Sequence, residues 1–258
     1  GEYALRAAIG AYLHSARGVE CRPEQILVGA GSEYLLMLLS QILGRGKRVA
    51  MESPTYKQAY RVLGGAGYPV IPVSMDSRGM EVKGLEESGA DVVHVSPSNH
   101  FPTGIVMPIT RRLELSEWVG RVKKRYIIED DYDSEFRYSG KFILPMYAED
   151  TQNKVIYMNT FSKSMVPSLR ISYMVLPPDL LQRYIDTMSF YSCTVSSFEQ
   201  YALARFISEG HFERHINHMR NYYRGQRARI LSAVKNSPLG EISKIIEQNA
   251  GTHFLLNV

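Results

Sequence analysis

Short apolar runs alternate with amphipathic segments along the first two thirds of this 258-residue chain. Helical stripes are visible at residues 4–16 and 109–123, and a further apolar helix follows Ser32, which suits an N-cap. The strand-like runs lie at residues 25–28, 48–51, 70–73, 91–95, 126–128, 154–158 and 171–176. Strands that alternate with helices of this length predict an α/β fold built from βαβ units around a mostly parallel sheet.

Length and composition narrow the class of protein. A chain of 258 residues holds one large domain or a domain and a half. No apolar run reaches the roughly 18 residues of a membrane span, and no signal peptide is visible at the start. The net charge of +4 comes from scattered residues, so charge alone does not indicate nucleic-acid binding. Two cysteines, Cys21 and Cys193, form no disulfide framework, and we expect a cytoplasmic protein.

The hydrophobic pattern of the sequence changes after about residue 178, and helical stripes dominate at 179–190, 195–208 and 211–235. We therefore predict a large domain over 1–190 and an incomplete smaller domain over 191–258. The last residues, 252–258, read as a strand that needs a partner. Both ends of the chain look cut, and we expect the sequence to be an excerpt of a longer protein.

Five polar or glycine-rich features directly follow strand-like runs. They are the turn Gly29-Ala30-Gly31-Ser32, Tyr56, the loop Ser96–Gly104, Asp130 and Lys163. Ligands of parallel α/β sheets bind outside the carboxyl ends of the strands. These features are therefore expected to meet at one edge of the sheet.

The residue types match the needs of pyridoxal phosphate, an aldehyde cofactor held as a Schiff base on a lysine. Lys163 can supply the amine, and Asp130 can supply the carboxylate that keeps the ring nitrogen protonated. Tyr132 can donate to the phenolic oxygen and Tyr56 can lie on the ring.

The phosphate of such a cofactor needs backbone N–H groups at a helix start, hydroxyl groups and an arginine. The residues expected to form this cup are Gly31, Ser32, Glu33, Thr160, Ser162 and Arg170.

Several of these features also have plainer interpretations. The glycine turn can be a simple N-cap, and Glu129-Asp130-Asp131 can be a metal cluster. His211, His215 and His218 share a helical face that can hold zinc, although a polar helix face is the favoured interpretation. We expect no metal in the site. The arginine-rich helix that follows is interpreted as a solvated or subunit-facing surface.

Three motifs carry a family resemblance. They are the segments 96–104 (SPSNHFPTG), 129–138 (EDDYDSEFRY) and 160–170 (TFSKSMVPSLR). They resemble fold type I pyridoxal-phosphate-dependent aminotransferases, and more narrowly the aminotransferase-like domain of MocR/GabR-type regulators of the GntR family. The resemblance runs over nearly the whole chain. It implies a three-layer α/β/α aminotransferase class I/II fold with part of a smaller C-terminal α+β domain.

The resemblance also implies roles and partners. Lys163 would hold the cofactor, Asp130 its pyridine nitrogen, Tyr132 its phenolic oxygen and Arg170 its phosphate, with Tyr56 stacked on the ring. A homodimer is implied, and DNA binding only through an N-terminal winged helix-turn-helix that this chain lacks.

Two departures from the aminotransferase pattern bear on function. Phe101 stands where ordinary aminotransferases have the asparagine of Asn-Pro-Thr-Gly, which favours the regulator branch. The arginine that holds a substrate carboxylate is expected beyond Val258.

Two functions follow. The first is a cofactor-binding effector domain of a transcription regulator that senses a small amine or amino acid. The alternative is an active aminotransferase acting on an amino acid or amine, with Lys163, Asp130 and Tyr132 as its catalytic residues.

Overall fold

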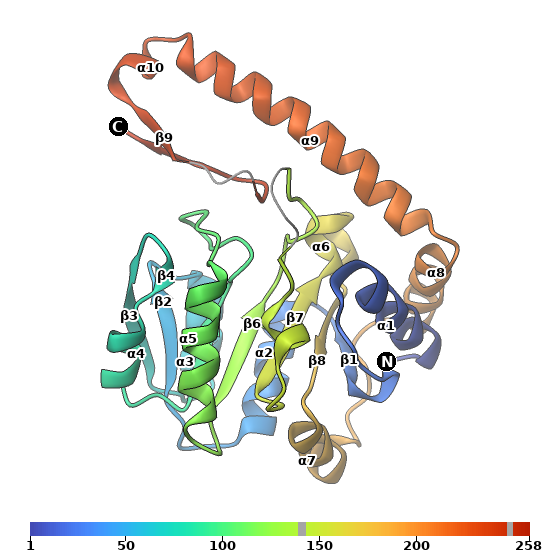
Figure 1. The fold of residues 1–258 in the computed structure, drawn as a ribbon. Helices are drawn as coiled ribbons and strands as arrows, with labels where there is room; N and C mark the ends of the chain where they lie inside the picture. The colour runs from blue at the N-terminus through green and yellow to red at the C-terminus, as the bar shows by residue number, and fades with distance from the viewer. Residues whose placement is uncertain (139–142, 247–249) are drawn as a thin grey trace.

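An eight-stranded sheet forms the centre of the computed structural model, which describes residues 1–138, 143–246 and 250–258 (Figure 1). The strands are β1 (Ile26–Gly29), β2 (Val49–Ser53), β3 (Val70–Asp76), β4 (Gly79–Met80), β5 (Val92–Val95), β6 (Tyr126–Asp130), β7 (Val155–Thr160) and β8 (Ser172–Val175). Their order is β1-β8-β7-β6-β5-β2-β3-β4. Strands β3, β2, β5, β6 and β7 pair in parallel, which confirms the predicted sheet.

Strand β1 runs in the same direction as the parallel strands, although it pairs with the antiparallel strand β8. Because β8 runs antiparallel to both β7 and β1, β1 points the same way as the parallel strands. The turn that follows Gly29 therefore lies at the same edge as the carboxyl ends of β2, β5, β6 and β7.

Helices cover both faces of the sheet and make a three-layer α/β/α fold (Figure 1). The helices are α1 (Tyr3–Arg17), α2 (Ser32–Leu43), α3 (Lys57–Gly65), α4 (Val82–Glu87), α5 (Ile109–Gly120), α6 (Phe161–Ser164), α7 (Pro178–Met188), α8 (Ser197–Ser208), α9 (His211–Lys235) and α10 (Leu239–Ile242). Helices α2, α3 and α7 pack on one face, while α4 and α5, with α1 and α8 beside them, pack on the other.

Strand alternation explains these layers. Ile128 packs against the α2 layer, whereas its neighbour Ile127 packs against the α5 layer. Similarly, Met158 faces α2 and Tyr157 faces α1. Successive side chains of a strand point to opposite faces, so an apolar run without polar alternation is a strand buried on both sides.

The structure corrects one predicted helix boundary. Ser32 is the first residue of α2 and not its N-cap; the cap is Gly31, with φ +100° and ψ 163°. Residues with a side chain rarely adopt this conformation, so glycine is needed here. Strand β4 and helix α4 are further elements that the sequence pattern did not indicate.

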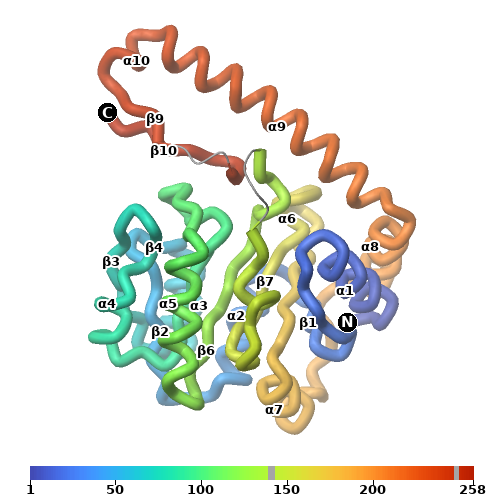
Figure 2. The backbone as a smooth tube through the Cα atoms, viewed as in Figure 1, coloured from blue at the N-terminus to red at the C-terminus, as the bar shows by residue number. Residues whose placement is uncertain are grey.

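The last part of the chain leaves the sheet (Figure 2). Helix α9 extends away, and among its described side chains only Phe212 and Ile216 are buried. Beyond α10, β9 (Lys244–Ile246) pairs antiparallel with β10 (Leu255–Asn257), the partner that the predicted terminal strand required. Helix α8 packs against α1 in the core around Leu5 and Leu203. The domain boundary near residue 190 stays a prediction. In the described ranges, no helix is both long and apolar enough to cross a membrane.

Candidate functional site

A cavity of about 320 Å³ opens at the carboxyl edge of the sheet. Its lining comes from the segments after β1, β2, β5, β6 and β7. The lining residues are Ser32, Glu33, Tyr56, Gln58, Ser96, Phe101, Asp130, Tyr132, Thr160, Ser162, Lys163 and Arg170. Nine of the ten predicted site residues are among them, and the tenth, Gly31, lies against the Arg170 guanidinium. The predicted meeting of strand ends is therefore present in the structure.

Lys163 lies in the short helix α6 that begins directly after β7. The Thr160 hydroxyl caps this helix by accepting from the Ser162 N–H at 3.2 Å. It also accepts from the Ser172 hydroxyl at 2.8 Å, which ties the cap to β8. Within the described part of the chain, no hydrogen bond or ion pair holds the Lys163 ammonium. The amine is thus placed by its helix and left available in the cavity.

Asp130 ends β6 and lines the cavity, whereas its two acidic neighbours point to the other face. Glu129 accepts hydrogen bonds from the backbone N–H groups of Met146 and Tyr147, at 2.8 and 2.9 Å. Asp131 forms an ion pair with Arg17 at 2.6 Å. The three carboxylates therefore do not converge, and in residues 1–138, 143–246 and 250–258 no group of three metal-ligating side chains is found.

His94 is a buried neighbour of Asp130. It lies in β5, next to β6, and its Nε2 is 3.6 Å from Asp130 Oδ2 with only 5% of its side chain exposed. His94 was not among the site residues predicted from the sequence. A signal was available, because His94 is the single polar residue in the buried run Val92–Val95.

Tyr132 lines the cavity, but its hydroxyl donates to the Asn99 carbonyl at 2.8 Å. The Asn99 side-chain amide lies 3.4 Å from the same hydroxyl and donates to Asp133 at 2.8 Å. Burial, together with the negative charges of Asp133 and Asp130, raises the pKa of Tyr132 well above its usual value. The phenol therefore stays protonated, and it must release the Asn99 carbonyl before it can donate to a ligand.

Two aromatic rings form a wall of the cavity. Tyr56 and Phe101 meet edge to face, with ring centroids 6.0 Å apart and an interplanar angle of 87°. Phe101 also packs against the His253 ring, with the two ring centroids 5.3 Å apart. This edge-to-face arrangement is a favourable one for aromatic pairs. Phe101 thus has a packing role at the position where the sequence departs from the aminotransferase pattern.

The predicted phosphate cup is assembled around Gly31. A Cβ on Gly31 would lie 2.3 Å from Arg170 Nη2, so only glycine lets the guanidinium approach this backbone. Arg170 itself has φ +48° and pairs with Glu33 at 2.8 Å. The Ser162 hydroxyl is buried and has no hydrogen-bond partner within the described segments. An orphaned hydroxyl beside an arginine and a helix start fits an anion site.

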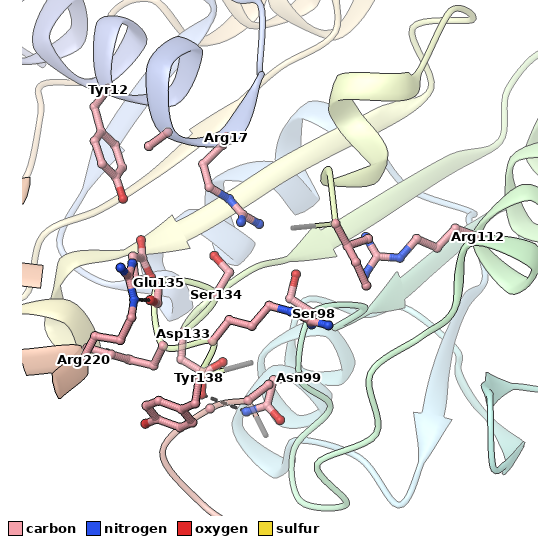
Figure 3. A pocket seen from close by; sticks show the side chains of 16 residues that line it. Tyr12, Arg17, Ser98, Asn99, Arg112, Asp133, Ser134, Glu135, Tyr138 and Arg220 are labelled. Carbon is pink, nitrogen blue, oxygen red and sulfur yellow. Dashed lines mark hydrogen bonds between the residues drawn. The ribbon is translucent and has the colours of Figure 1, made fainter. Parts of the chain in front are cut away.

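A second cavity of about 320 Å³ is lined in part by residues 133–138, which follow Tyr132 in the sequence (Figure 3). Arg17, Glu135 and Arg220 are among the side chains around it. It contains none of the predicted site residues. Burial raises the pKa of Asp133 to about 8 and that of Glu135 to about 7. In water both carboxyl groups are ionised at neutral pH, whereas burial in the folded chain favours their protonated forms.

This burial leads to a pH prediction for Asp133→Asn. The pKa of Asp133 is about 4 in the unfolded chain and is raised to about 8 in the folded chain. The wild type therefore loses stability as the pH rises between these two values. The asparagine variant lacks this loss, and its stability relative to wild type should rise by up to about 1.4 kcal/mol per pH unit in that window. Urea unfolding at pH 5 and pH 8 measures the difference. A difference that is constant with pH would contradict the buried, neutral carboxyl.

The family model for aminotransferase class I and II matches residues 1–256. The chain belongs to this family. The "Uncharacterized HTH-type transcriptional regulator YdeL" of Bacillus subtilis is 42% identical over all 258 residues, which make up 55% of that protein. The "Probable rhizopine catabolism regulatory protein MocR" of Rhizobium meliloti is 36% identical, with 97% of this chain and 51% of that protein covered. The aminotransferase-family chain thus spans about half the length of the curated relatives it matches.

A solved aminotransferase confirms the fold. The kynurenine aminotransferase of Pyrococcus horikoshii, solved in a complex with PMP, superposes with a TM-score of 0.84 at 30% identity. The superposition covers 97% of this chain and 64% of that one. The family assignment confirms the predicted α/β/α aminotransferase fold and supports pyridoxal phosphate as the cofactor.

Proposed function

We propose that this chain is the pyridoxal-phosphate-binding effector domain of a MocR-type transcriptional regulator of the GntR family. The observation that carries the proposal is that Lys163, Asp130 and Arg170 line one cavity at the carboxyl edge of the sheet. The regulator names of relatives with 36–42% identity support the regulatory role. We assign DNA binding to a helix-turn-helix segment of the whole protein, outside this chain.

The residues of the cavity fit the cofactor one group at a time. When bound, pyridoxal phosphate supplies an aldehyde carbon and a ring that draws electrons from an attached amine. The Lys163 amine would hold the aldehyde carbon, and the Asp130 carboxylate would hold the proton on the ring nitrogen. The His94 ring lies beside that carboxylate, with Nε2 3.6 Å from Asp130 Oδ2. Arg170 would bind the phosphate, and Tyr56, which lines the same cavity, would pack on the ring.

The remaining cup residues hold the phosphate through neutral donors. The Ser162 hydroxyl, which lacks a partner in the described residues, can donate to it. Ser32 and Glu33 form the first turn of α2, where backbone N–H groups have no partner within the helix, so these groups can also donate to the phosphate. Thr160 acts through its cap on α6, because its side-chain oxygen already accepts from Ser162 N and Ser172 Oγ.

A covalent labelling experiment tests the proposal on the full-length protein. After addition of pyridoxal phosphate and reduction with borohydride, we expect one pyridoxyl group per chain, attached to Lys163. Lys163→Ala should lose the label, while Lys57→Ala, on the neighbouring helix α3, should keep it. Label on another lysine, or no label, would overturn the assignment.

The expected biology follows from the same site. We propose that a small amine or amino acid is the effector, that the protein is a homodimer, and that it acts in the cytoplasm. Replacement of the Lys163 amine by the effector amine would then be the change at the site that is transmitted to the DNA-binding segment.

An active aminotransferase is the second candidate, favoured by the 30% identity to the Pyrococcus horikoshii kynurenine aminotransferase. In that case Lys163 also moves the proton between the α-carbon of the substrate and the cofactor. A panel of amino donors distinguishes the two functions. Formation of a keto acid from any donor supports the enzyme, whereas effector binding without keto acid supports the regulator.

A further inference from the structure

An acidic residue lies inside the cup that the proposed function gives to a phosphate. Glu33 is in the first turn of α2 and lines the same cavity as Lys163. Its Oε2 is 2.8 Å from Arg170 Nη2, the guanidinium that would hold the phosphate. A carboxylate and a phosphate on one guanidinium compete, because both are anions that favour the same fork of N–H donors.

The Glu33–Arg170 pair lies against the backbone of the cup. The site of an absent Cβ on Gly31 is 2.3 Å from Arg170 Nη2 and 3.0 Å from Glu33 Oε2. Both charged groups therefore contact the turn whose N–H groups open α2. A negative charge is stabilised at the start of a helix, and the Glu33 carboxylate already supplies one there.

The pair is weak enough to be displaced. Side-chain exposures of 51% for Arg170 and 38% for Glu33 leave it in contact with water, where ion pairs contribute little. A phosphate with about two charges can take the guanidinium from a carboxylate. Its arrival then leaves the Glu33 carboxylate next to another anion, and that repulsion opposes binding.

We propose that Glu33 sets the cofactor affinity by competing with the cofactor's phosphate for Arg170. The proposal rests on the function proposed above and assigns a specificity-determining role to one of its residues. Its consequence is selective: Glu33 weakens binding of the phosphorylated cofactor and leaves binding of unphosphorylated pyridoxal unaffected. In a sensor, such weakening makes cofactor occupancy respond to the cofactor concentration.

The test compares two ligands on two proteins. Wild-type full-length protein and Glu33→Gln are freed of cofactor and titrated with pyridoxal phosphate and with pyridoxal, with absorbance of the bound ligand as the readout. We expect Glu33→Gln to bind pyridoxal phosphate about tenfold more tightly, the order of magnitude for removal of one like charge at a partly exposed site. The Kd for pyridoxal should stay within about twofold of wild type.

Control variants separate the charge effect from general changes. Glu199→Gln removes an acid from the first turn of α8, outside the cavity, and should change neither Kd. Glu33→Ala should tighten pyridoxal phosphate binding in the same direction as Glu33→Gln, which shows that loss of the charge is responsible.

Each contrary outcome has a distinct meaning. An unchanged Kd for pyridoxal phosphate in Glu33→Gln overturns the inference, and so does an equal tightening of both ligands. Borohydride mapping of the same samples reports on the proposed function. A missing Lys163 label in both proteins overturns that function and this inference with it.

Discussion

Arg17→Met is expected to lower the free energy of unfolding by about 3–5 kcal/mol, because it leaves a buried carboxylate without its counter-charge. Arg17 Nη2 lies 2.6 Å from Asp131 Oδ2, with side-chain exposures of 6% and 0%. The hydroxyls of Tyr157 and Ser134 each donate to the same oxygen at 2.7 Å. These two hydrogen bonds do not replace the lost positive charge. Because Asp131 directly precedes Tyr132, we expect the substitution also to destabilise the loop after β6.

The pH dependence of this pair is opposite to that of Asp133. Burial raises the pKa of Asp131, but Arg17 and the hydroxyls of Ser98 and Tyr157 outweigh it, and the pKa is lowered. The stabilisation by Asp131 is therefore present above its unfolded pKa of about 3.9 and is lost as pH falls through the folded value. Arg17→Met should flatten the acid limb of the stability curve.

Urea unfolding at pH 7 measures the loss, with Arg205→Met as the matched control. Arg205 makes an i,i+4 pair with Glu209 at 2.9 Å, and its side chain is 79% exposed. Its removal should cost less than about 0.5 kcal/mol. A similarly small loss for Arg17→Met would contradict the prediction, because it would show that the buried Asp131 carboxylate does not need the Arg17 charge.

The position of the candidate site was predictable because it depends on strand direction. Residues that follow parallel strands meet at one edge, so Tyr56, Asp130 and Lys163 could be brought together from sequence alone. The turn at Gly31 joins them only because β8 is antiparallel to two neighbours. No sequence pattern indicated that pairing, yet the resulting direction of β1 is the one that the prediction required.

Contacts between side chains of different elements could not be predicted in the same way. His94 reaches Asp130 because β5 and β6 are in register with His94 opposite Ile128. The Glu33–Arg170 ion pair joins residues 137 positions apart. Such contacts depend on sheet register and on rotamers, and neither is encoded in a local motif. The error at Ser32 has a local cause, because Gly31 occupies a backbone conformation that favours glycine as the cap.

Asp130→Asn is expected to slow the reaction of the bound cofactor with an added amine by about a hundredfold, while Lys163 remains labelled after borohydride reduction. Asp130 is the lining carboxylate at the end of β6, and His94 lies 3.6 Å behind it. An amide of the same size keeps the shape of the cavity and removes the charge that holds the ring proton. Attachment to Lys163 needs the aldehyde alone, whereas the reactivity of the attached amine needs a protonated ring.

Stopped-flow absorbance of the bound cofactor after mixing with an amine gives the rate, and mass mapping gives the label. Asp186→Asn, on the exposed side of α7, is the matched control and should react as the wild type does. An unchanged rate in Asp130→Asn would remove Asp130 from the ring nitrogen. A lost label would show instead that Asp130 is needed to form the site, because the charge effect by itself leaves Lys163 and the phosphate cup intact.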